Sequence, residues 1–168
     1  MKLKIFVWII SLITLCSLVP GSLNDLFAQA SSLSAEQKEQ LKLAEAYDAQ
    51  IEQYYEQGLF KKFFKKALPL AKNALKIRNE ILGEKHPDTL ESLGNLAMIY
   101  YEFSRESDAL PLLEKSYSLR KEVLGEKHPD TLESLGNLAM IYYELDRLSE
   151  ALSLLEKNYS LRKEVLGS

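Results

Sequence analysis

Apolar residues recur at intervals of three and four along most of this chain, which is the spacing of helices with one buried face. One set comprises Leu90, Leu93, Ala97 and Tyr100. A later set comprises Leu110, Leu113, Tyr117 and either Val123 or Leu124. Each set is long enough for one helix, so the pattern predicts an all-α chain in which a helix, a short turn and a second helix alternate.

Residues with strong positional preferences mark the expected ends of these helices. Pro87 suits the first helical position, because the N–H that proline lacks has no partner there. Gly83 suits the position just after the preceding helix, where a left-handed conformation costs glycine little. Ser34 and Gln37 have the spacing of a capping box, which predicts that the first helix of the repeat region starts after Ser34.

The helix pairs are copies of one another. The segment LGEKHPDTL at residues 82–90 returns at residues 124–132, a period of 42 residues. Residues 84–125 and 126–167 are identical at 36 of 42 positions, which indicates a recent duplication. An older copy with four additional residues between Glu56 and Ala67 precedes them. The chain thus divides into a leader (1–30), a degenerate unit 1 (31–83), unit 2 (84–125) and unit 3 (126–168).

These units resemble tetratricopeptide repeats, specifically the 42-residue kind found in kinesin light chains and many bacterial proteins. The matching features are the HPDTL start, Leu96-Ala97 and Tyr100 in the first helix, Ala109 and Leu113 in the second, and the closing Leu-Gly. The resemblance implies a right-handed α-solenoid of three helix-turn-helix units, because one helix pair cannot cover its own apolar stripe and must stack on a neighbour. Ser104 and Asp146 stand where the family has its turn glycine, so we expect a looser turn there.

In the family, the first helices of the units line a concave groove that holds an extended peptide. The resemblance places in this groove Glu91, Asn95, Met98, Tyr101 and Glu102 of unit 2, and Glu133, Asn137, Met140, Tyr143 and Glu144 of unit 3. The corresponding residues of unit 1 are Glu45, Ala49, Glu52, Tyr55 and Glu56. Asn95 and Asn137 match asparagines that hold a ligand's backbone in related repeats through their two-sided amides. The alternative interpretation is that these positions, above all the glutamates, are merely solvated.

Charge narrows the expected partner to a protein or peptide with basic groups. Glu91 and Glu133 stand where family members that capture a C-terminal carboxylate carry lysine or arginine, so a carboxylate clamp is not expected. An acidic groove favours a ligand with Lys, Arg or a free amine. Residues 31–168 carry 19 basic and 23 acidic residues, a formal net charge of −4, which argues against nucleic acid as a partner.

The lysines at positions 61, 62, 65 and 66 interleave with Phe60, Phe63 and Phe64. The simpler interpretation is an apolar face that packs inward while the lysines remain in water. A membrane-surface or anionic-partner site is the alternative.

Residues for catalysis or metal binding are scarce. Cys16 is the only cysteine and lies in the leader, and His86 and His128 repeat at turn positions and are too few for a typical catalytic zinc site. The sequence contains no Ser/His/Asp constellation, phosphate-cradling glycine loop or zinc-ligand spacing. It therefore predicts a non-enzymatic protein that needs no cofactor or metal.

The leader has the pattern of a secretory signal peptide. Lys2 and Lys4 precede an apolar run over residues 5–19, and Ala28 and Ala30 place small residues before a cleavage site. We expect a secreted or periplasmic protein after cleavage near Ala30, with no membrane contact of the mature chain. The alternative is a protein anchored through an uncleaved leader, either by its helix or by a lipid on Cys16.

The C-terminal end of the array lacks the polar capping helix with which such arrays normally finish. An apolar edge is therefore expected on the last helix, formed by Leu154, Leu155, Leu161 and Val165. Self-association through this face, a truncated gene product and a piece of a longer array all remain open. The alternative function is accordingly an N-terminal repeat array, or a fragment, of a larger multidomain protein such as one with a caspase-like peptidase domain.

Overall fold

A computed structural model describes residues 32–56 and 60–167 of the chain, so the predictions for the leader lie outside the described residues. It divides into two units, Met1–Lys38 and Glu39–Ser168. The described helices are α3 (Ala35–Glu56), α4 (Phe60–Leu82), α5 (Pro87–Glu102), α6 (Glu106–Leu124), α7 (Pro129–Glu144) and α8 (Leu148–Leu166). These residues contain no strand, which confirms the all-α prediction, and none of their helices is long and apolar enough to cross a membrane.

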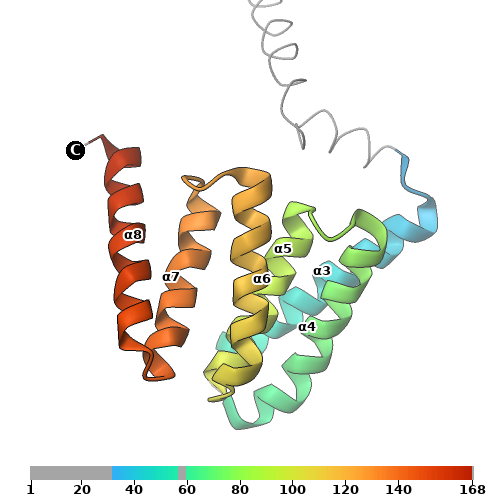
Figure 1. Cartoon of the computed structure of the whole chain (residues 1–168). Coiled ribbons are helices and arrows are strands. Elements are labelled where there is room, and N and C mark those ends of the chain that lie inside the picture. The colour runs from blue at the N-terminus through green and yellow to red at the C-terminus, as the bar shows by residue number, and fades with distance from the viewer. Residues whose placement is uncertain (1–31, 57–59, 168) are drawn as a thin grey trace, which may run out of the picture. The chain divides into compact units, whose positions relative to one another are not determined.

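Within residues 39–168 the helices stack in chain order, each of α4 to α7 packing on the next (Figure 1). This succession is the helical solenoid that the repeats predict. Helix α3 reaches its neighbours largely through side chains. Asp48 of α3 forms an ion pair of 2.6 Å with Arg78 of α4, and the ammonium of Lys66 lies 5.5 Å from the centre of the Tyr54 ring.

The helix ends follow the positional preferences in the sequence. Helix α5 starts at Pro87, and Gly83 has a positive φ of 89° after the end of α4. The predicted capping box is present: the Ser34 N–H donates to Oε1 of Gln37 at 2.9 Å, and the Gln37 N–H donates to Oγ of Ser34 at 3.1 Å. Local sequence therefore determines where these helices begin and end.

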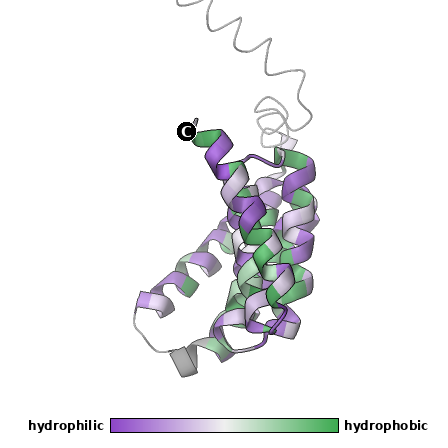
Figure 2. Ribbon diagram, turned by 60° about the vertical axis from the view of Figure 1, so that its left-hand side comes forward, coloured by the Kyte–Doolittle hydropathy of each residue, from purple (hydrophilic) through white to green (hydrophobic). Residues whose placement is uncertain are grey.

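Small residues allow the helices to approach closely in the core. Ala97 of α5 and Ala139 of α7 are fully buried, as are Ala67 of α4 and Ala109 of α6. The larger apolar core residues, such as Leu113, Leu138 and Ile141, fill the space around them. In Figure 2 the hydrophobic positions concentrate where the helices face one another, which is the arrangement expected when each amphipathic face needs a neighbour for burial.

Ion pairs attach each turn between units to the second helix of the unit that follows it. Lys127 lies 2.9 Å from Glu164 of α8, and Lys85 pairs in the same way with Glu122 of α6. In the same turn as Lys127, Glu126 forms a second ion pair of 2.6 Å with Lys157 of α8. All these side chains are substantially exposed, so the pairs orient the turns more than they stabilise the fold.

The turns inside units 2 and 3 are closed by hydrogen bonds although they lack the glycine of the family. Ser104 and Asp146 adopt positive φ angles of 51° and 59°. The Ser104 N–H donates to the Tyr101 carbonyl oxygen at 2.9 Å, and the Asp146 N–H donates to the Tyr143 carbonyl oxygen at 3.0 Å. In both turns a residue with a side chain is thus accommodated in a backbone region that favours glycine.

Helix α4 has 23 residues, whereas α6 has 19, and the additional turn stands at the start of α4. The ring of Phe64 lies 4.5 Å from that of Phe103 and 6.5 Å from that of Tyr100, between centroids. Phe64 thus packs inward, as the simpler interpretation of the lysine-rich segment predicts, while the side chains of residues 60–63 lie outside the described set.

Candidate functional site

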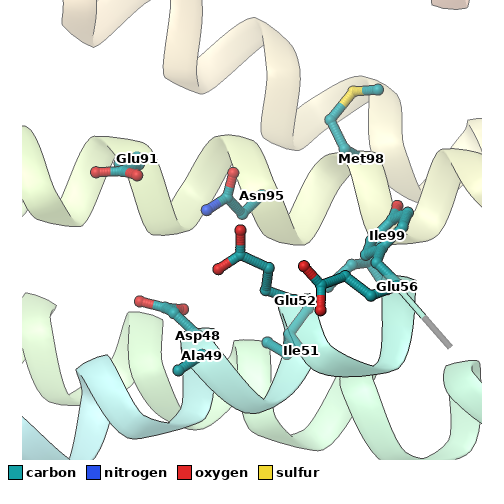
Figure 3. A pocket seen from close by; sticks show the side chains of 10 residues that line it. Asp48, Ala49, Ile51, Glu52, Glu56, Glu91, Asn95, Met98 and Ile99 are labelled. Carbon is teal, nitrogen blue, oxygen red and sulfur yellow. The ribbon is translucent and has the colours of Figure 1, made fainter.

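A cleft of about 660 Å³ lies between α3 and α5, the first helices of units 1 and 2. Its walls are formed by Asp48, Ala49, Ile51, Glu52, Tyr55 and Glu56 of α3, and by Glu91, Asn95, Met98 and Ile99 of α5. Figure 3 shows Glu52 pointing from α3 toward Asn95 on α5. Apolar side chains and carboxyl and amide groups together line the cleft.

The structure brings together predicted residues from two units. Glu91, Asn95 and Met98 line the cleft, and they face Ala49, Glu52, Tyr55 and Glu56 from the older unit. Glu45 is not among the lining residues. Its place is taken by Asp48, which sequence reasoning missed. Asp48 forms an ion pair with Arg78 of α4. Because the two residues are 30 positions apart in the chain, helical spacing alone does not predict this contact.

Tyrosines and glutamates connect the first helices along this face. Burial and the Glu102 carboxylate raise the pKa of Tyr55, which places Tyr55 of α3 near Glu102 of α5. One unit further on, burial and the carboxylates of Glu144 and Glu102 raise the pKa of Tyr101. Glu144 of α7 thus acts electrostatically on Tyr101 of α5 as Glu102 of α5 acts on Tyr55 of α3.

The predicted residues of unit 3 lie on α7, whose 16-residue sequence is identical to that of α5. Asn137 and Met140 are half-buried, Glu133 and Glu144 are exposed, and Tyr143 is 62% exposed. Tyr143 occupies the position of Tyr101 in unit 2, which is half-buried beside the next first helix. The same sequence therefore differs in exposure between the two units: Tyr143 is more exposed than Tyr101, whereas Asn137 is less exposed than Asn95.

Unbalanced negative charge characterises the cleft. Glu52, Glu56 and Glu91 form no ion pair within the described residues, whereas Asp48 is paired with Arg78. The side-chain amide of Asn95 likewise makes no hydrogen bond among those residues, so its N–H₂ and oxygen are available to a ligand. Carboxylates that share a cleft without counter-ions attract cationic groups.

The two histidines have a structural role. Nδ1 of His86 accepts a hydrogen bond of 3.2 Å from the Asp88 N–H at the start of α5, and His128 does the same for Asp130 at the start of α7. Each histidine is thus the N-cap of a first helix, which explains its repetition. No group of three or more potential metal ligands occurs in the described part of the chain.

Comparison with protein families identifies the chain. The family model described as tetratricopeptide repeat matches residues 54–122 and 107–164, which together are more than half of the chain. The chain therefore belongs to the tetratricopeptide repeat family, whose repeats generally serve as scaffolds for protein–protein interaction. A search of curated proteins finds no match.

Solved structures with the same fold include relatives of kinesin light chains. The crystal structure of BtubC (BKLC) from P. vanneervenii has a TM-score of 0.65 at 22% identity, over 73% of this chain and 46% of that one. Two crystal structures of a putative kinesin light chain from Podosopora anserina with nearly identical TPR-like repeats, one of them of a variant, share 27% identity with this chain. Their TM-scores are 0.58 and 0.59, over 83% of this chain and 63% of theirs. The chain spans less than two thirds of the length of each of these proteins.

Proposed function

We propose that this protein is an exported, non-enzymatic scaffold that binds an extended, basic segment of a partner protein in the groove formed by α3, α5 and α7. The observation that carries the proposal is the cleft between α3 and α5, because it is built from equivalent positions of successive repeats. A ligand that runs across successive first helices meets the same residues in units 2 and 3, whereas unit 1 has Ala49 and Glu52 at the positions of Asn95 and Met98.

Asparagine amides supply the directional contacts. Asn95 and Asn137 occupy the same position in two units, and an amide can both donate to and accept from a peptide backbone. Each hydrogen bond contributes about 0.5–1.5 kcal/mol, so affinity requires several bonds together with apolar contact. Met98 and Ile99 provide apolar surface in the cleft. Met98 is adaptable because its side chain is unbranched.

The unpaired glutamates determine the preferred charge of the ligand. Lysine or arginine side chains of an extended segment would neutralise Glu52, Glu56 and Glu91 without displacing an existing ion pair. An acidic segment, or a free C-terminal carboxylate, would meet repulsion at the same place. The proposal therefore distinguishes this groove from carboxylate-capturing members of the family.

Peptide arrays test the proposal directly. Residues 31–168 are suitable as the probe, because residues 39–168 form a unit that contains the core. Lysine- and arginine-containing peptides should bind, and the same peptides with glutamate at those positions should not. Replacing both groove asparagines, Asn95→Ala plus Asn137→Ala, should weaken binding about tenfold or more while helicity and melting temperature stay nearly unchanged.

The matched control is Asn73→Ala, which removes an exposed asparagine from α4 outside the cleft. Its binding should equal that of the unchanged chain. Equal binding of basic and acidic peptides, or equal losses from the groove variant and the control variant, would contradict groove recognition.

Export is tested separately. N-terminal sequencing of the protein recovered from its native cell should begin near Ser31, and fractionation should place it outside the cytoplasm. A mature protein that retains Lys2 and Lys4 and sediments with membranes would favour the uncleaved, anchored alternative.

A further inference from the structure

An exposed apolar stripe runs along the whole of α8. Its apolar residues are Leu148, Leu152, Leu155, Tyr159 and Leu166, and all are more than half exposed. Together with Arg162, which lies between Tyr159 and Leu166, these residues are spaced four, three, four, three and four positions apart. This is the spacing of a seam along which one helix packs against another of similar length.

The same positions are covered one unit earlier. Leu113 of α6 and Leu155 of α8 are equivalent residues of the repeat, yet Leu113 is 1% exposed and Leu155 is 51% exposed. Leu113 shares a core cluster with Leu138 and Ile141 of α7, the helix that packs on α6. Nothing in the described residues covers α8 in this way. The stripe on α8 is therefore an apolar face that no helix among the described residues covers.

One sequence difference between α6 and α8 indicates what kind of helix covers the stripe on α8. Leu148 of α8 replaces Glu106 of α6, and Glu106 remains partly exposed although α7 covers α6. A further helix of the α7 kind would thus not require leucine at position 148. A helix that lies along the full length of α8 would require it, because Leu148 extends the stripe to the very start of the helix.

Helix α3 of another copy is a poor candidate for this position. Leu138 and Ile141 are the residues of α7 that pack in the core. The equivalent positions of unit 1, 88 residues earlier in the chain, are Gln50 and Gln53 on α3. Both glutamines are exposed. Packing them on the leucines of α8 would bury amides without partners, which disfavours head-to-tail association.

We propose that α8 packs against α8 of a second copy in an antiparallel, two-fold symmetric pair. The stripe is suited to pairing with itself, because reversal about position 157 places Leu148 opposite Leu166 and Leu155 opposite Tyr159. Arg162 falls opposite Leu152, so its stem covers the leucine while its guanidinium, held through Nε by Asn158 Oδ1 at 2.9 Å, stays at the edge. The pair spans the 19 residues of α8, about 28 Å.

Light scattering and sedimentation equilibrium of residues 31–168, from low micromolar to several hundred micromolar, test the association. The expected mass is that of two chains at the higher concentrations. Leu155→Glu should weaken the dimer at least tenfold without changing helicity. The control is Leu43→Glu, which places the same charge at an exposed leucine on α3 and should leave the dimer intact. A single-chain mass throughout, or equal effects of the two variants, would overturn the proposal and leave α8 to a different occupant such as a further repeat unit.

Disulfide cross-linking tests the orientation, because the chain has no cysteine beyond Cys16 of the leader. In an antiparallel pair the two copies of position 148 lie 18 residues apart along the helix axis, about 27 Å, which is too far for a disulfide. Leu148→Cys alone should therefore stay unlinked under oxidation, as should Leu166→Cys alone. A mixture of the two variants should form a linked heterodimer. Self-linking of Leu148→Cys would establish a parallel pair and overturn the arrangement.

Discussion

Arg120 of α6 donates two hydrogen bonds to α7 through Nη1, one of 2.8 Å to Oγ of Ser134 and one of 3.1 Å to the carbonyl oxygen of Asp130. The equivalent arginine one unit earlier, Arg78, binds Ser92 of α5 in the same way. The second helix of each unit is thus tied to the first helix of the next by one repeated contact. Arg162 occupies this position on α8 and contacts only Asn158 of its own helix among the described bonds.

Arg120→Ala should therefore destabilise the chain more than Arg162→Ala. The first change removes charge-assisted bonds at a half-buried site and leaves the Ser134 hydroxyl without its donor, at a cost of about 1–3 kcal/mol. The second removes one partly buried bond to Asn158 of the same helix and should cost less, about 1 kcal/mol. Urea denaturation followed by circular dichroism measures both. Equal losses would show that the arginine acts within its own helix.

Leucine truncation provides a second matched pair. Leu113→Ala should cost about 2–5 kcal/mol, because it leaves a cavity in the core between α6 and α7. Leu155→Ala changes the same repeat position on α8, where half of the side chain is already in water, and should cost less than about 1 kcal/mol when the chain is monomeric. Thermal denaturation at high dilution is the appropriate measurement. A large loss at Leu155 under those conditions would indicate an unrecognised intramolecular contact.

Glycine should improve the turns inside units 2 and 3. Ser104 and Asp146 have positive φ angles, a conformation that costs a residue with Cβ roughly 1–2 kcal/mol. Replacing these residues with glycine removes that cost, and part of the resulting stabilisation is offset by the greater freedom of glycine in the unfolded chain. Ser104→Gly plus Asp146→Gly should thus raise the melting temperature. Gly125→Ala, which introduces a side chain where φ is 90°, should lower it. A decrease in both cases would show that the side chains of Ser104 and Asp146 stabilise their turns.

Stability should depend on pH through His86. Burial lowers the pKa of His86 below its ordinary value of 6.5, an effect that Asp88 partly opposes and Arg78 reinforces. The unfolded chain consequently takes up a proton near pH 6.5 before the folded chain does. The contribution of neutral His86 is present above pH 6.5 and is lost as the pH falls toward the lower, folded pKa.

His86→Asn checks this dependence, because asparagine keeps an N-cap acceptor for the Asp88 N–H and does not titrate. Its free energy of unfolding should fall less than that of the unchanged chain as the pH drops below 6.5. Carboxylates such as Glu84, whose pKa lies below 4.5 because Lys115 pairs with it, should keep their contribution to stability down to about pH 4.5 and lose it only below that pH. Identical pH profiles for the two proteins would assign the loss of stability to other groups.

Much of the fold was predictable because its determinants are local. The repeated segments can be recognised by comparing the sequence with itself. The helix ends depend on residues close in sequence, namely the capping box of Ser34 and Gln37, Pro87 and Gly83. Asn95 and Met98 line one cleft for the same reason, since helical spacing determines which side chains share a face.

Local sequence is sufficient to assign each repeat position to a helix, a turn, a cap or an apolar face. The partner of each face, in contrast, depends on how the helices pack. Leu113 and Leu155 have nearly the same neighbours along the chain, yet one is buried and the other exposed. Asp48, which lines the cleft, is paired with Arg78 on another helix. Helical periodicity is local, whereas burial and electrostatic pairing depend on which helix lies alongside, and in a stack of near-identical units that differs from one position to the next.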